Sequence, residues 1–392
     1  MSEGDHEPLA GLYVHVPFCS AICPYCDFAV TLGGSDRRQD FVATICREAD
    51  LVGADDWRFD TLYFGGGTPS ALEGDLLEEL IAGLRSRLGV DEETHLSLEA
   101  NPEDVDASSC RRWKELGVRT LSLGVQAFDD RSLRFLGRRH SADEARRAVA
   151  VALDAGFDCV SVDLIFGFPR EARDCQDAVP ASLRTVMELS PQHVSCYQLT
   201  VHGATPFGVQ LRQGRLREMG SDEQAAAFLQ IHDELSAGGF EAYEVSNFAR
   251  APEFRSRHNQ KYWRHVSYLG LGPSAHSFDG RRRWWNERSL VDYATEVQAG
   301  RRPVAGEEEL SQADLLLEVL MLRLRTSEGL DLESIEERFG VDLLAANQEL
   351  VERLIGEGRF VLDGARLRPT LKGMAIADSL AAEFSLPKPA FG

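Results

Sequence analysis

The fold is decided by the stretch Tyr13-Val-His-Val-Pro-Phe-Cys19-Ser-Ala-Ile-Cys23-Pro-Tyr-Cys26-Asp-Phe28, which joins a predicted strand to a loop with three cysteines. The cysteines stand at i, i+4 and i+7, a spacing that also suits one face of a buried helix. Pro17 and Pro24 argue against a continuous helix, because proline lacks the amide proton and clashes with the preceding turn. We therefore expect a loop that presents three thiolates after a strand.

Three thiolates can hold three irons of a [4Fe–4S] cluster, for which cysteine is the usual ligand. No fourth cysteine lies nearby, so one iron would stay open to chelate the amino and carboxylate groups of a small molecule. The spacing, after a Tyr-x-His-x-Pro-Phe strand end, resembles the signature of the radical S-adenosylmethionine (SAM) superfamily. That resemblance implies a cluster on Cys19, Cys23 and Cys26 with SAM at its open iron. A structural zinc site with His15 as the fourth ligand is the main alternative.

Short apolar, β-branched segments alternate with segments of helical period, which is typical of βαβ units and a parallel sheet. Six such units predict an α/β fold with a partial (β/α)6 TIM-like barrel of the radical SAM kind. The predicted strands are Leu12–Val16, Thr61–Phe64, His95–Glu99, Thr120–Gly124, Val160–Ile165 and His193–Leu199. The predicted helices are Asp36–Val52, Glu73–Leu88, Asp104–Leu116, Ala142–Ala155 and Cys175–Glu188.

We expect three parts: the barrel at 1–202, a middle α+β region at 203–300 and a C-terminal domain at 301–392. The last part reads as helices followed by Phe360–Leu362, an Asp363-Gly364 turn and Arg366–Arg368, which predicts a winged-helix-like domain. Winged helices often bind DNA, but acidic side chains outnumber basic ones here. We therefore expect a packing or lid domain.

Composition and charge limit the classes of function. The net charge of −21 repels phosphate backbones, so we expect no nucleic-acid partner. Eight cysteines, three of them close together, do not resemble a disulfide framework. The sequence lacks a long apolar run and begins with an acidic segment, which predicts a cytoplasmic protein without a membrane span.

Polar residues recur where the predicted strands end. Gly65-Gly66-Gly67-Thr68 follows the second strand, where glycine lets the backbone approach a ligand and we expect free amides. Glu99 and Gln126 follow the third and fourth strands, and Asp163 closes the fifth. The carboxyl ends of barrel strands meet at one end, so we expect these residues to line one site. Taken singly, each is equally explained as a turn or a solvated side chain.

Over nearly the whole chain these motifs resemble the oxygen-independent coproporphyrinogen III oxidase family of radical SAM proteins. Matched position by position, the family's motifs imply SAM contacts by Tyr13, Gly66, Gly67, Thr68, Glu99, Gln126, Arg138 and Asp163. For Arg138 the assignment rests on the resemblance alone. The family contains oxidases, which decarboxylate porphyrinogen propionates to vinyls, and HemW-type haem chaperones, which bind haem and pass it to an acceptor protein.

Three features favour the chaperone group. Asp27-Phe28 follows the third cysteine where the oxidases have Gly-Cys, and only about ten residues precede Gly11, where the oxidases have a longer extension. The third is a match to the chaperones' His-Asn-x-x-Tyr-Trp motif, which implies haem contacts by His258, Asn259, Tyr262 and Trp263.

The chemistry of the same region suits haem. Imidazole can ligate haem iron, and arginine binds carboxylates such as haem propionates. The segment from Arg255 to Arg288 contains eight Arg or Lys residues and two acidic residues. Trp284 and Trp285 in the same segment offer stacking surface. His276 is a second candidate ligand, although a hydrogen-bonded structural role is the alternative for it and for His258.

We therefore expect a chaperone that binds haem, SAM and a [4Fe–4S] cluster and delivers haem to an unidentified haem-acceptor protein. Two other classes stay open at this point. The first is the oxidase, an enzyme that produces protoporphyrinogen IX. The second is an iron–sulfur redox sensor that binds DNA through its winged helix. The sequence leaves a homodimer open and assigns no catalytic residue.

Overall fold

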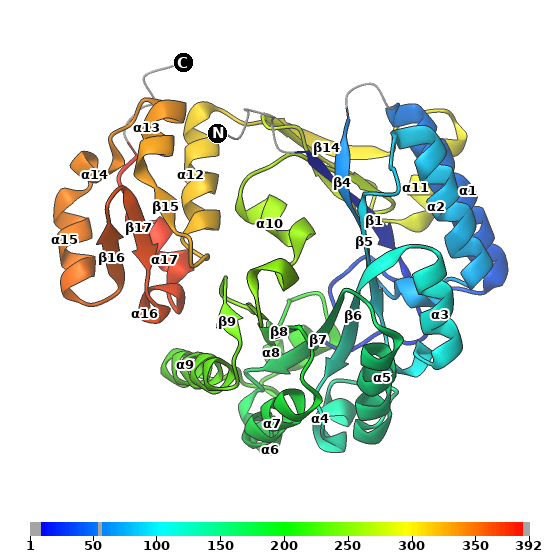
Figure 1. The fold of residues 1–392 in the computed structure, drawn as a ribbon, viewed down its shortest axis with the longest axis horizontal. Coiled ribbons are helices and arrows are strands. Elements are labelled where there is room, and N and C mark those ends of the chain that lie inside the picture. Colours follow the sequence, from blue (N-terminus) through cyan, green and yellow to red (C-terminus); the bar gives the residue numbers. More distant parts are fainter. Residues whose placement is uncertain (1–8, 54–56, 387–392) are drawn as a thin grey trace.

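The computed structural model describes residues 9–53 and 57–386. A twelve-stranded sheet forms the main body, in the order β14-β13-β12-β11-β1-β4-β5-β6-β7-β8-β10-β9. Figure 1 shows this sheet curving around a central space, with helices along its outer side and the C-terminal domain beside the open side. In the described part of the chain, no helix is both long and apolar enough to cross a membrane.

Six neighbouring strands of the sheet are parallel and match the predicted ones. They are β1 (Ala10–Val16), β4 (Phe59–Gly66), β5 (His95–Ala100), β6 (Val118–Gln126), β7 (Cys159–Phe166) and β8 (His193–Gln198). The helices between them are α1 (Ser35–Val52), α2 (Gly74–Leu88), α3 (Ala107–Glu115), α4 (Asp130–Phe135), α5 (Ala142–Ala155), α6 (Arg173–Asp177) and α7 (Val179–Leu189). The predicted partial (β/α)6 barrel is confirmed.

Two predicted helices differ from the observed ones for local reasons. The helix expected from Asp104 begins only at Ala107, because the Asp106 side chain accepts hydrogen bonds from the amides of Ser108 and Ser109 and caps it there. The helix expected from Cys175 is two helices, α6 and α7. The second begins with Pro180 in its first turn, where the missing amide proton costs nothing.

The interior of the barrel is polar. Along β5, Leu96 and Leu98 are buried in the apolar core, whereas Ser97 and Glu99 line a cavity inside the barrel. Successive side chains of a strand point to opposite faces, so each strand carries an apolar face and a polar one. The interior of a closed TIM barrel is a packed apolar core, whereas this open barrel leaves room for ligands.

The middle region extends both edges of the same sheet. On one edge β11 (Tyr268–Leu271) runs parallel to β1 and is followed by antiparallel β12 (His276–Phe278), β13 (Arg282–Asn286) and β14 (Val304–Glu309). On the other, β10 (Asn247–Ala249) and β9 (Glu241–Ala242) continue from β8. Its helices are α8 (Pro206–Arg212), α9 (Ser221–Ala237), α10 (Arg257–Trp263) and α11 (Leu290–Gln298).

The C-terminal part has its own apolar core and the expected winged-helix-like order. Its sheet runs β15 (Leu330–Asp331), β17 (Arg366–Pro369), β16 (Phe360–Asp363). Its helices are α12 (Gln312–Arg323), α13 (Leu332–Phe339), α14 (Leu343–Ala346), α15 (Gln348–Gly356), α16 (Leu371–Met374) and α17 (Ala377–Ala381). The Tyr243–Asn247 segment joins it to the barrel: Ser327 N donates to Tyr243 O (3.0 Å) and Val245 N donates to Arg325 O (3.0 Å).

A buried carboxylate, Glu48 on α1, fixes the β11–β14 extension. Its oxygens accept hydrogen bonds from Gly272 N (2.8 Å), Asn286 Nδ2 (2.5 Å) and Tyr293 Oη (2.6 Å). Gly272 has φ of 97°, and a Cβ there would meet His15 O at 2.6 Å, so the turn after β11 requires glycine. Gly272 therefore has a structural role at this turn.

We predict that Glu48→Ala lowers the free energy of unfolding by roughly 3 kcal/mol or more, because it leaves three buried donors without an acceptor. Glu48→Gln keeps an acceptor for Gly272 and Tyr293 and should cost less than half as much. Denaturant unfolding of both variants measures the difference. An alanine variant as stable as the wild type would contradict the role assigned to Glu48.

Candidate functional site

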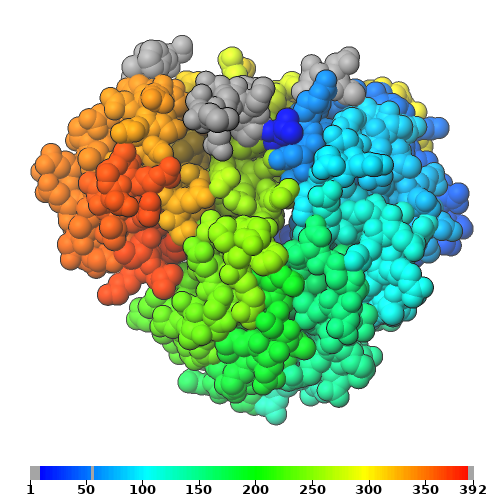
Figure 2. Space-filling model, viewed as in Figure 1, coloured from blue at the N-terminus to red at the C-terminus, as the bar shows by residue number. Residues whose placement is uncertain are grey.

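A cavity of about 710 Å³ lies inside the barrel and extends to the carboxyl ends of its strands. In Figure 2 the surface is hollowed near the centre of the molecule, between the yellow-green and cyan parts of the chain. Tyr13, a predicted SAM contact, does not line the cavity itself but stacks on Tyr63, which does, with ring centroids 6.2 Å apart. The predicted residues that line the cavity are Cys19, Cys23, Cys26, Gly66, Gly67, Thr68, Glu99, Gln126, Arg138 and Asp163.

The cysteine loop is closed by local contacts. The short strands β2 (Phe18–Cys19) and β3 (Thr31–Leu32) pair at its two ends, and Cys26 N donates to Cys23 O across a turn (3.2 Å). Buried His15 places its Nε2 2.9 Å from Ala29 O and its Nδ1 3.2 Å from Tyr13 Oη. Both ring nitrogens are engaged, so His15 holds the loop and is not available as a zinc ligand.

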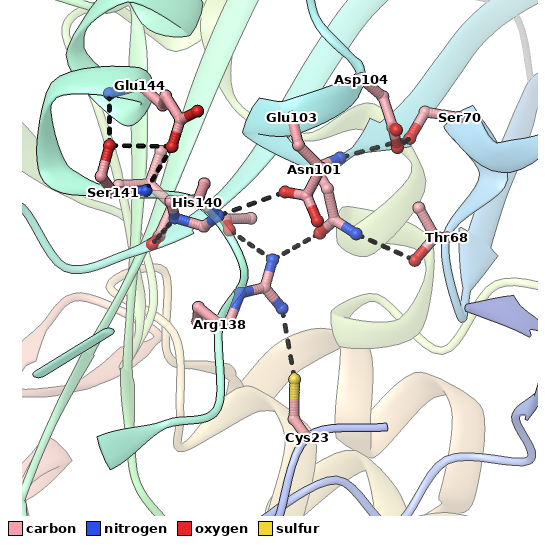
Figure 3. A network of polar contacts seen from close by, with 12 residues as sticks. Cys23, Thr68, Ser70, Asn101, Glu103, Asp104, Arg138, His140, Ser141 and Glu144 are labelled. Atoms are coloured by element: carbon pink, nitrogen blue, oxygen red, sulfur yellow. Dashed lines mark hydrogen bonds and ion pairs between the residues drawn. The ribbon is translucent and has the colours of Figure 1, made fainter. Parts of the chain in front are cut away.

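Arg138 connects Cys23 to the strand ends, as Figure 3 shows. Its Nη1 lies 3.6 Å from Cys23 Sγ, and its Nη2 donates to Gly124 O (2.8 Å) and to Asn101 Oδ1. Asn101 Nδ2 in turn donates to Thr68 Oγ1 (3.1 Å), whose hydroxyl lies 3.5 Å from Cys19 Sγ. A guanidinium and a hydroxyl therefore lie beside two of the three sulfurs, where they would stabilise thiolates that bind a cluster.

Two partly buried carboxylates line the cavity without an ion-pair partner in the described residues. Burial raises the pKa of Glu99 to about 7, although hydrogen bonds from Tyr63 Oη (2.8 Å) and Gly66 N (3.2 Å) oppose this. Burial also raises the pKa of Asp163 to about 6, opposed by hydroxyls that include Ser122 Oγ at 3.2 Å. A cationic ligand would offset this cost, and SAM carries a sulfonium and an amino group.

The backbone makes a close approach after β4 and adopts an unusual conformation at the end of β6. A Cβ on Gly67 would meet Phe18 O at 2.8 Å, so glycine lets this turn approach the cysteine loop. The expectation of free amides there is wrong for two positions, since Gly66 N donates to Glu99 and Gly67 N donates to Val16 O (2.8 Å). Gln126 follows a β-bulge in β6 and has φ of 68°, a strained conformation of the kind found at functional sites.

Of the four residues of the His-Asn-x-x-Tyr-Trp motif, only Asn259 lines the cavity. His258 is buried behind the wall, with Nδ1 2.9 Å from Thr61 Oγ1 and Nε2 2.9 Å from Tyr262 Oη. Burial lowers the pKa of His258 to about 3. The ring stacks on Tyr63 at 5.2 Å, so in this conformation haem iron would reach a nitrogen of His258 only by displacing a hydrogen bond.

The basic segment Arg255–Arg288 is largely paired with acids from other elements. Arg264 contacts Glu328 (2.9 Å) and Arg283 contacts Glu318 (2.7 Å). Further pairs join Arg255 to Glu241, Lys261 to Asp60, Arg281 to Glu309 and Arg282 to Glu307. Within residues 9–53 and 57–386, Arg257 has no hydrogen bond or ion pair from its side chain, and it lines the cavity.

Sequence reasoning missed several polar residues of the wall. Ser161 Oγ lies 2.7 Å from His193 Nδ1, and His193 Nε2 lies 2.8 Å from Tyr243 Oη, which links the cavity to the joint with the C-terminal domain. The missed cavity-lining residues include Ser97, Ser122, Ser161, His193 and Ser195. The alternation of serine with Leu, Val or Cys along β5 to β8 was the available signal.

The chain is similar to known protein families and to named relatives over most of its length. Residues 13–179 match the Radical SAM superfamily and residues 310–376 match the HemN C-terminal domain. The protein named heme chaperone HemW from Mycobacterium tuberculosis (strain ATCC 25618 / H37Rv) is 35% identical over 376 residues, covering 94% of this chain and 93% of that protein. The one from Escherichia coli (strain K12) is 34% identical over 329 residues, covering 82% and 84%.

The chain belongs to the HemW family of radical SAM proteins. A solved structure of Escherichia coli coproporphyrinogen III oxidase superposes with a TM-score of 0.80 at 21% identity, covering 96% of this chain and 90% of that one. This likeness shows the shared fold. The HemW family assignment brings a [4Fe–4S] cluster and SAM as cofactors, and the zinc alternative is wrong. When bound, they supply electrons and an organic radical.

The residues of this HemW-family chain fit both cofactors. Three thiols line the cavity, with Arg138 and Thr68 beside two of them, and two carboxylates without an ion pair in the described residues line the same cavity. The assignment of individual SAM contacts stays a prediction.

We predict that Cys23→Ala abolishes cluster reconstitution, because an iron loses its thiolate. Anaerobic reconstitution followed by iron, sulfide and visible-absorbance measurements tests this. Cys110→Ala is the matched control, since Cys110 is buried on α3 away from the cavity and the variant should retain the cluster. A full cluster in Cys23→Ala would contradict the assignment.

We predict that Glu99→Gln weakens SAM binding about tenfold to a hundredfold, the range for losing a charged hydrogen-bond partner. Because the pKa of Glu99 is about 7, wild-type affinity should fall from about pH 8 to about pH 6 as the carboxylate is protonated, and this dependence should shrink in the variant. Anaerobic calorimetry measures both effects. Exposed Glu79→Gln is the control, and equal affinities for Glu99→Gln and wild type would refute the contact.

Proposed function

We propose that this protein is a haem chaperone, which binds haem and delivers it to an acceptor protein. The observation that carries this proposal is the 35% identity to the Mycobacterium tuberculosis protein named heme chaperone HemW over 94% of the chain. Asp27-Phe28 after the third cysteine supports it, because the oxidases resembled by the chain have Gly-Cys there.

Arg257 is the residue that we propose for a haem propionate. It lines the cavity, and neither a carboxylate nor a carbonyl holds its guanidinium in the described part of the chain. Arginine binds carboxylates with two parallel hydrogen bonds, so a propionate is a suitable partner. Most other basic side chains of the 255–288 segment are paired with acids, which also argues against a nucleic-acid partner.

The haem-motif residues keep a supporting role in this proposal. His258 backs Tyr63 and Tyr13, while Asn259 stands on the cavity wall beside Arg257. Direct haem contact by His258 would displace its hydrogen bond with Tyr262, and neither Tyr262 nor Trp263 lines the cavity. A homodimer and a cytoplasmic location remain expectations from the sequence.

The second candidate is the enzyme coproporphyrinogen III oxidase. One observation favours it: the cavity keeps nearly all the predicted SAM residues together, as an active radical SAM enzyme would require. The fold it shares with the Escherichia coli oxidase is compatible with either function, because function depends on the site rather than on the fold.

The test is anaerobic reconstitution with iron and sulfide, followed by titration with haem and by an assay of coproporphyrinogen conversion with SAM and a reductant. We predict a stoichiometric haem complex and no vinyl product. The Escherichia coli oxidase, assayed in parallel, controls for the conversion conditions. Conversion without stable haem binding would make the protein an oxidase and refute the chaperone proposal.

A further inference from the structure

A rigid turn after β8 presents His202 beside the cysteine loop. The carbonyl of His202 accepts hydrogen bonds from Thr205 N (3.0 Å) and Thr205 Oγ1 (2.8 Å). A Cβ on Gly208 would meet the same carbonyl at 2.2 Å, so α8 packs directly against the turn. Phe207 N donates to Pro24 O (3.0 Å), which ties the turn to the segment between Cys23 and Cys26.

Three described histidines line the cavity, and they differ in which ring nitrogens are free. His193 has both nitrogens engaged, by Ser161 and Tyr243. His95 places Nε2 2.8 Å from Thr120 Oγ1 at the opposite ends of the strands. The side chain of His202 is 47% exposed, with Nδ1 3.3 Å from Asp27 Oδ2, and its Nε2 has no hydrogen bond in the described residues.

The Asp27 carboxylate lies beside one ring nitrogen of His202. The carboxylate lies beside Nδ1, so Nε2 is the ring nitrogen that can reach a ligand in the cavity. The backbone at Asp27 is held by Arg288, which donates to its carbonyl. Metal-ligating histidines commonly have a carboxylate near the second ring nitrogen.

The surroundings of His202 suit a flat apolar molecule. Ile22 and Phe28 of the cysteine loop are at least half exposed and line the same cavity, as do Tyr197 and Leu199 from the end of β8. Arg257 stands on another part of the same wall. An axial ligand, apolar contacts and a free guanidinium are the three kinds of group that bind haem.

We propose that His202 Nε2, on the ring that lies beside Asp27, is the axial ligand of haem iron at the end of the cavity where the cluster cysteines lie. This inference rests on the proposed haem-chaperone function and names the site at which that function would operate. It assigns iron ligation to His202 instead of the buried His258.

The experiment is an anaerobic titration of the reconstituted full-length protein with haem, followed by optical spectra of the complex. His202→Ala should raise the Kd for haem more than tenfold and alter the Soret band. Asp27→Asn should raise the Kd by about tenfold, as expected for loss of an outer carboxylate partner. Glu79→Gln is the control, because Glu79 is exposed on α2 outside the cavity wall, and it should bind like the wild type.

A second variant separates ligation from folding. His202→Gly should recover the wild-type haem spectrum when free imidazole is added, whereas a merely structural defect would not respond. A Kd and spectrum of His202→Ala equal to the wild type's would overturn this site and leave the chaperone proposal intact. Absence of haem binding by the wild type itself would overturn both.

Discussion

The alternation of apolar and polar side chains along the barrel strands is the constraint on which the structure depends. Outward residues such as Leu96 and Leu98 bury apolar surface against helices, and this burial stabilises the sheet. Inward residues such as Ser97, Glu99 and Asp163 cannot form an apolar core, so the interior stays a polar cavity. Partial burial of these carboxylates costs solvation free energy. A cationic ligand bound in the cavity would offset that cost.

Stability must then come from the edges and the outer layer. Glu48 fixes the β11–β14 extension through three hydrogen bonds, and the Tyr243–Asn247 segment joins β8 to the C-terminal domain. In that segment buried Glu244 accepts a hydrogen bond from Asn247, and burial raises the pKa of Glu244 to about 7. Glu48 with its partners and the Tyr243–Asn247 segment thus hold the parts of the sheet around the cavity.

The sequence predicted the six parallel strands, the winged-helix-like end and the residues gathered at the strand ends, because period-two patterning and the cysteine spacing are local signals. Other features depend on contacts that are distant in the sequence. The parallel pairing of β11 with β1 and the pairing of basic residues with acids from α12 and β14 are examples. His258 belongs to a sequence motif and His202 does not. The fold shows that both nitrogens of His258 are engaged, whereas Nε2 of His202 is free among the described residues.

We expect one polar cavity to hold the cluster on the cysteine loop and haem at its edge. The most direct test is an anaerobic crystal structure of the protein loaded with cluster, SAM and haem, with iron located by anomalous scattering. The account predicts one iron signal at Cys19, Cys23 and Cys26 and a second bonded to His202 Nε2. A haem iron at His258 or His276, or on a surface outside the cavity, would contradict it.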